Sequence, residues 1–133
     1  MTSWADKARD ARAHQVKPVP VNIAGMKKGQ VMLVPSVRIV DAFIRRLPPG
    51  RLLDAKALRA KLARRYHTEV TCPITTGFVL RIVAEAAWEA RQAGAATGDI
   101  TPVWRVLDDD SLTLKKLPRA AAAFFRARRA EET

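Results

Sequence analysis

The sequence has a single cysteine, Cys72, among 133 residues, which excludes an intramolecular disulfide. No apolar run approaches the roughly 20 residues that a membrane-spanning helix needs. Residues 1–14 lack the apolar core of a secretory signal peptide, because Asp6 and Asp10 lie among their basic residues. We therefore expect a cytoplasmic protein with no membrane partner, associated with the nucleoid if the source is bacterial.

The sequence also lacks the common signatures of metal- and cofactor-dependent enzymes. It has two histidines, and neither has companions at the spacing of a structural zinc site. No glycine-rich phosphate loop or dinucleotide-binding fingerprint occurs, so we expect no metal and no cofactor. Aromatic residues make up 6% of the chain, which disfavours a single-strand platform that stacks bases on aromatic rings.

Positive charge is what the sequence has in excess. Lys and Arg number 24 against 13 Asp and Glu, and the formal net charge is +11. A surplus of this size indicates a polyanionic partner, most often nucleic acid. A basic surface that serves solubility is the alternative. With 48% apolar and 28% charged residues, the composition is that of an ordinary globular domain.

We divide the chain into an N-terminal extension, residues 1–35, and a DNA-binding domain, residues 36–133. Residues 3–13 carry charges at helical spacing with Trp4 as the large apolar residue, which predicts a short, loosely attached helix. Prolines and glycines punctuate residues 16–29 and predict a loop without helix or strand. Lys27 and Lys28 would let this loop cross a DNA backbone. A linker that wraps the core is the alternative.

The second part predicts alternating caps, helices and turns. Ser36 is placed to cap a helix through residue 47, whose apolar stripe is Val37, Val40, Ile44 and Leu47. Asp54 is placed to cap a second helix through about residue 66, whose buried stripe is Ala57, Leu58, Leu62 and Ala63. A third helix is predicted from Gly77 to about residue 93, then strands at residues 102–107 and 112–114 around an acidic turn, and a helix from Pro118. This order predicts an α+β, mainly helical fold: a winged helix-turn-helix-like single domain with an N-terminal extension.

Basic and hydroxyl side chains of this region are the candidates for DNA contact. Those of the second predicted helix would neutralise phosphates, although a solvated helix face is the alternative. Arg81 would enter the minor groove, or else pair with Glu85 four residues later. The candidate DNA-binding residues are Lys27, Lys28, Lys56, Arg59, Lys61, Arg64, Arg65, Thr75, Thr76 and Arg81.

The string Pro102-Val103-Trp104-Arg105-Val106 resembles the active-site motif Pro-Cys-His-Arg-Val of the alkylguanine-DNA alkyltransferases. Two further strings agree with this family. Residues 47–50 (Leu-Pro-Pro-Gly) resemble its Ile-Pro-x-Gly, and residues 81–86 (Arg-Ile-Val-Ala-Glu-Ala) resemble its minor-groove helix Arg-Ala-Val-Gly-x-Ala. The resemblance spans residues 37–114 and implies the fold of the family's C-terminal DNA-binding domain, in which Arg81 would enter the base stack.

The departures from the family concern its chemistry and its lesion pocket. Val103 stands in place of the acceptor cysteine, and valine is no nucleophile, so alkyl transfer at this position is excluded. Ala55 stands in place of a tyrosine that helps rotate the phosphate, and the pocket-closing loop is not recognisable after residue 106. We expect Trp104 to pack in the core and Arg105 to have a structural role.

Loss of the nucleophile is shared with the alkyltransferase-like proteins, which bind alkylated DNA without repairing it and attract other factors. We therefore predict a non-catalytic protein that binds duplex DNA, senses alkylated bases and has DNA-repair proteins as further partners. Two alternatives stay open. One is an enzyme with Cys72 as nucleophile or alkyl acceptor and His67 as base, although a lone cysteine is more often a buried apolar residue. The other is binding to RNA or the ribosome. The oligomeric state is left open.

Overall fold

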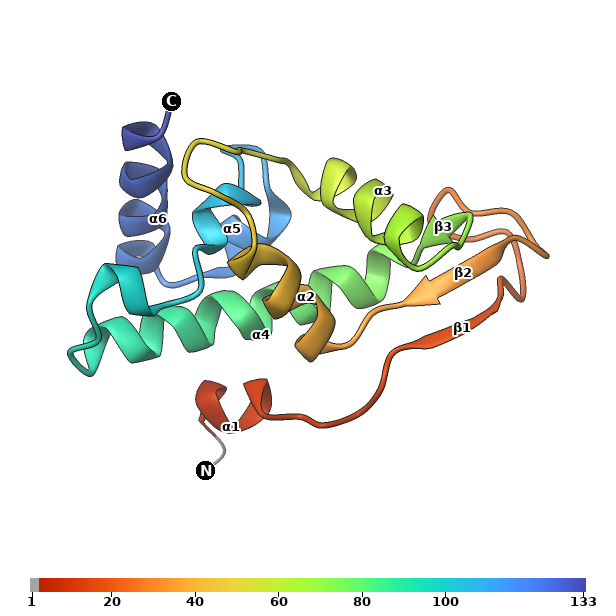
Figure 1. The fold of residues 1–133 in the computed structure, drawn as a ribbon, viewed down its shortest axis with the longest axis horizontal. Coiled ribbons are helices and arrows are strands. Elements are labelled where there is room, and N and C mark those ends of the chain that lie inside the picture. Colours follow the sequence, from red (N-terminus) through yellow and green to blue (C-terminus); the bar gives the residue numbers. More distant parts are fainter. Residues whose placement is uncertain (1–2) are drawn as a thin grey trace.

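The computed structural model describes residues 3–133 and has an α+β, mainly helical architecture (Figure 1). A long helix, α4, runs along the molecule, with the sheet near its beginning and α6 beside its end. The helices are α1 (Trp4–Ala8), α2 (Val37–Arg45), α3 (Ala55–Arg65), α4 (Pro73–Gln92), α5 (Leu112–Lys116) and α6 (Arg119–Glu131), with 3-10 helices η1 (Thr97–Asp99) and η2 (Val103–Arg105). No helix in residues 3–133 is both long and apolar enough to cross a membrane.

The predicted caps of α2 and α3 are confirmed. The Ile39 amide donates to Ser36 Oγ at 3.2 Å, and the Ala57 amide donates to Asp54 Oδ1 at 2.7 Å. Each cap satisfies one of the amides that a helix leaves unpaired in its first turn. The apolar stripe predicted for α2 is buried, although the helix ends at Arg45, two residues early.

Helix α4 begins four residues before the predicted start at Gly77. Pro73 occupies its first turn, where a proline loses no hydrogen bond because first-turn amides have no helical acceptor. Thr75 and Thr76 therefore belong to the helix and not to a turn. Gly77 has helical backbone geometry with open space around it, so it interrupts nothing.

The N-terminal region is more ordered than its composition predicts. Strands β1 (Gln15–Pro18), β2 (Val31–Val34) and β3 (Val70–Thr71) form one sheet, in which β2 pairs antiparallel with β1 and parallel with β3. The prediction that residues 16–29 contain no strand is thus wrong for β1. Pro18 is compatible with β1 because it lies at the end of an edge strand, where its missing N–H costs little.

The description of residues 3–13 as a loosely attached arm is also wrong. Helix α1 ends at Ala8 and packs against α4. The amides of Trp4 and Ala5 donate to the two carboxylate oxygens of Glu89, at 3.1 and 3.2 Å. A carboxylate at a helix N-terminus satisfies free amides and favours the helix dipole, so Glu89 anchors α1.

The two strands predicted for a wing are absent. Residues 103–105 form the 3-10 helix η2, and residues 112–116 form α5. The Leu114 amide donates to Ser111 Oγ at 3.3 Å, so a serine cap starts a helix where apolar alternation predicted a strand. The predicted last helix from Pro118 is confirmed as α6.

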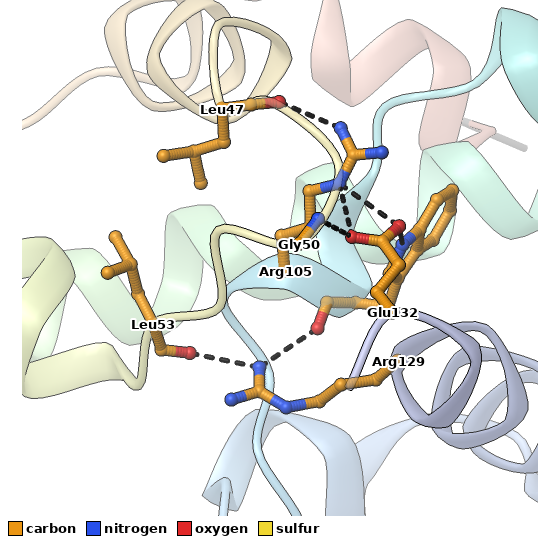
Figure 2. Close-up of polar contacts among 7 residues, drawn as sticks. Leu47, Gly50, Leu53, Arg105, Arg129 and Glu132 are labelled. Atoms are coloured by element: carbon orange, nitrogen blue, oxygen red, sulfur yellow. Dashed lines mark hydrogen bonds and ion pairs between the residues drawn. The ribbon is translucent and has the colours of Figure 1, made fainter.

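The carboxylate of Glu132, just after α6, binds two segments that are distant in sequence, the turn at Gly50 and η2 (Figure 2). It accepts hydrogen bonds from the Gly50 amide at 2.7 Å, Trp104 Nε1 at 2.6 Å and Arg105 Nε at 3.0 Å. The side chains of Arg105 and Glu132 are 12% and 11% exposed. Burial alone raises the pKa of Glu132, but the bonds from Arg105, Gly50 and Trp104 outweigh it and lower the pKa from 4.5 to about 2.

Two arginines extend this network to backbone carbonyls. Arg105 Nη1 donates to the Leu47 carbonyl at 2.8 Å, and Arg129 Nη1 donates to the carbonyls of Leu53 and Trp104, each at 3.0 Å (Figure 2). Leu47 and Leu53 lie in the irregular segment between α2 and α3, where no helix or sheet supplies hydrogen bonds to their carbonyls. The path of this segment is therefore held by η2 and α6 together, which Glu132 and Arg129 join.

Replacing Glu132 by Gln should destabilise the protein by about 2 kcal/mol, because the part-buried Arg105 guanidinium loses its charged hydrogen-bond acceptor. Urea unfolding followed by circular dichroism measures this difference. Glu131→Gln is the matched control, since the exposed pair of Glu131 with Arg128 is worth less than about 0.5 kcal/mol. Equal midpoints for the two variants would refute the structural role of the network.

The contribution of Glu132 should depend on pH in a defined direction. Its pKa is lowered in the folded protein, so its stabilisation is complete above pH 4.5 and is lost as the pH falls toward about 2. The stability gap between the wild type and Glu132→Gln should therefore narrow across this range. A gap that stays constant from neutral pH down to pH 2 would contradict the assignment.

Candidate nucleic-acid interface

Helix α3 presents a cationic surface. Its sequence contains five basic side chains and no carboxylate, and Leu58, Leu62 and Ala63 form its buried stripe. Within residues 3–133, none of these five makes an ion pair with a carboxylate. The basic residues are Lys56, Lys61, Arg64 and Arg65, all exposed, and the half-buried Arg59.

The β1–β2 loop adds two exposed lysines. The Lys27 amide donates to Gln30 Oε1 and the Lys28 amide to Asn22 Oδ1, each at 2.8 Å, so side-chain acceptors hold this part of the loop. The loop lies at the same end of the molecule as β3 and the last turn of α3 (Figure 1). Lys27 and Lys28 thus belong to a loop at the same end of the molecule as the last turn of α3, which contains Arg64 and Arg65.

The two candidate threonines of α4 are less available than the sequence suggests. Thr76 is 1% exposed, and its hydroxyl donates to the Cys72 carbonyl at 2.7 Å. Its selection as a surface contact is therefore wrong, because a serine or threonine hydroxyl inside a helix bonds readily to a preceding carbonyl. Thr75 is half-buried and donates to Cys72 Sγ at 3.5 Å.

Arg81 is held by neighbours on α4 and α1. Its Nε lies 3.6 Å from the buried carboxylate of Glu85, and its guanidinium lies 5.4 Å from the ring of Trp4. The ion pair that the sequence offered as the alternative to DNA contact is therefore present. The contact of Arg81 with Trp4 was not predicted from the sequence. The only signal for it was the spacing of Glu85 and Glu89, four residues apart on α4, which places two carboxylates on one face of the helix.

A groove of about 350 Å³ opens where α3, α4 and α5 meet. Lys56 and Arg59 of α3 line it beside Gly77 of α4, and three aspartates line it as well: Asp54 before α3, and Asp108 and Asp110 before α5. Ala55, where the family resemblance places a tyrosine, also faces this groove. The site combines hydrogen-bond donors and acceptors with apolar wall, which suits a small heterocycle better than a phosphate.

The residues of the family-like motif lie inside the protein. Pro102 is buried, Val103 is 0% exposed, and Trp104 stacks on Phe125 with ring centroids 6.4 Å apart. The expected core position of Trp104 is confirmed, and Arg105 has the structural contacts with Glu132 and Leu47 described above. Pro102, Trp104 and Arg105 line a pocket of about 270 Å³ together with Arg45 and Arg128, so Val103 is the one of the four positions that offers no surface to a ligand.

Cys72 is 8% exposed and lies in a small apolar cluster with Val19, Met26 and Met32. This is the buried, apolar environment that the sequence favoured. His67 is exposed, at a backbone position with positive φ after the end of α3. Among residues 3–133 no three His, Cys, Asp or Glu side chains gather as a metal site requires.

Comparisons of the chain with models of protein families, with curated proteins and with solved structures each find no match. The resemblance to the alkyltransferases therefore depends on the strings at residues 47–50, 81–86 and 102–106 alone.

Proposed function

We propose that the protein binds duplex DNA without catalysing a reaction on it. The observation that carries this proposal is the set of five basic side chains on α3 that have no carboxylate partner in residues 3–133. Unpaired lysines and arginines neutralise phosphates and release counterions, which is the main source of sequence-independent affinity for DNA. Lys27 and Lys28 extend the same contact from the β1–β2 loop.

In this proposal α3 and α4 act as a helix-turn-helix. The first half of α4, which carries the exposed side chains Ile74 and Phe78, faces the duplex. Two features support a non-catalytic role. Val103 offers no nucleophile, and the Cys72 thiol is enclosed by apolar side chains. DNA-repair proteins would then be recruited to the bound site.

Binding should weaken steeply with salt, and three α3 residues should account for part of the slope. We expect the triple variant Lys61→Gln, Arg64→Gln, Arg65→Gln to reduce the slope of log K against log salt by up to about 0.9 per lost phosphate contact. Fluorescence anisotropy with a labelled duplex measures this.

The matched control is Lys115→Gln, Lys116→Gln, Arg119→Gln, which removes the same charge from exposed residues of α5 and α6. It should leave the slope nearly unchanged. Equal losses for the two triples would mean that net charge alone drives binding. If duplex RNA competes as well as duplex DNA, the partner is any polyanionic duplex and not DNA in particular.

The groove between α3, α4 and α5 favours a more specific version, in which an alkylated base turned out of the duplex is bound there. Its mixed lining can hydrogen-bond the edge of a base, and carboxylates such as Asp108 and Asp110 accept from exocyclic amino groups. The alkyltransferase resemblance supports the same version.

A duplex with one O6-methylguanine should bind about ten-fold more tightly than its undamaged twin, since one good base contact contributes roughly 1–3 kcal/mol. Anisotropy titration of the two duplexes at one salt concentration measures the ratio. Asp110→Asn should reduce the preference, and Asp109→Asn, next to it but outside the groove lining, should not. Equal affinity for both duplexes would remove lesion sensing and leave general DNA binding.

A further inference from the structure

Phe78 is the one aromatic side chain in residues 3–133 that stands largely in solvent, with 68% of its surface exposed. It lies in the second turn of α4, and Ile74, one turn earlier on the same face, is 46% exposed. Exposed single apolar residues are common, but a large aromatic ring beside a second exposed apolar residue is not. Neither side chain belongs to the buried stripe that holds α4 in the fold.

The outer face of α4 has two halves with different surroundings. Positions 74, 78, 81 and 85 follow one another along one side of the helix. The second half is occupied, because α1 packs there, Glu89 caps α1, and Arg81 lies between Glu85 and Trp4. The first half, with Ile74 and Phe78, is left open. Helix α1 thus masks the acidic part of this face and not the apolar part.

The open half of α4 is a ridge between two grooves. Gly77 lines the groove that Lys56 and Arg59 line together with Asp54, Asp108 and Asp110, and Phe78 lines a second groove with Arg12 and Asp10. Glycine at this position leaves open space around its Cα, with no atom within 4 Å of the place where a Cβ would be. An extended polyanion held by α3 can therefore approach the ridge of α4 closely, with Phe78 as its most prominent side chain.

We propose that Phe78 is a wedge that enters the base stack of the bound duplex and bends it, while the cations of α3 hold the flanking phosphates. The inference rests on the proposed DNA binding and adds its mode. Apolar side chains that enter a base step from the minor groove unstack it and kink the duplex by roughly 20–90°. Phe78 has the size and the exposure for this role, and Lys56 and Arg59 of α3 line the groove on the Gly77 side of it. Ile74, one turn away, would cover the unstacked base pair.

The test combines affinity with a measure of DNA shape. Anisotropy gives the affinity, and energy transfer between dyes on the two ends of a duplex shorter than the DNA persistence length gives the bend. The variants are Phe78→Ala, the conservative Phe78→Leu, and the control Val16→Ala, which trims an apolar side chain that is 53% exposed on β1. Thermal unfolding checks that each variant keeps the fold, as exposed positions permit.

We expect wild-type protein to raise energy transfer between the duplex ends. Phe78→Ala should abolish this rise and weaken binding about ten-fold, with an unchanged salt slope. Phe78→Leu should keep most of the bend, and Val16→Ala all of it. If the wild type binds without bending and Phe78→Ala binds as well, the wedge is refuted while DNA binding stands. If the wild type binds no duplex at all, both proposals fall.

Discussion

The part-buried pair of Glu132 and Arg105 is the interaction on which much of the remaining arrangement depends. It joins the end of α6 to η2 and, through the Gly50 amide and the Leu47 carbonyl, to the turn between α2 and α3. A buried carboxylate without donors would be strongly destabilising, and here the guanidinium, the indole N–H and an amide all satisfy it. The position of α3, and thus of its cations, follows from where this turn is held.

The same network explains why a string that resembles a catalytic motif has no catalytic geometry. In this chain Trp104 and Arg105 turn inward to Glu132, and Val103 is closed off from solvent between them and the core. The tight 3-10 turn of η2 suits these inward contacts better than an extended strand would. Through Arg105, the motif stabilises the turn at residues 47–50. This turn is the second string that resembles the alkyltransferases.

The two halves of α4 are covered to different extents. At its second half, α6 packs Phe124 and Phe125 near Trp88, and α1 covers Glu85 and Glu89. At its first half, only the inner stripe is covered. A basic protein that left two carboxylates on the outer face of this helix would repel a phosphate backbone there. Covering them with a short N-terminal helix leaves a face of apolar and basic character, which agrees with the proposed partner.

The sequence by itself determined the local structure: the serine and aspartate caps, the buried stripes of α2 and α3, and the core positions of Trp104 and Cys72. These depend on neighbours within a turn or on simple burial of apolar surface, which periodicity reveals. Only the tertiary structure decided the rest. The strand β1, the helices that replaced the predicted wing, the anchoring of α1 by Glu89 and the burial of Thr76 depend on groups that are remote in sequence or on the depth of a residue within the fold. The exposure of Phe78 was also decided by the tertiary structure. Helical spacing places Phe78 outside the buried stripe of α4, but only the packing of the other elements leaves its side chain uncovered.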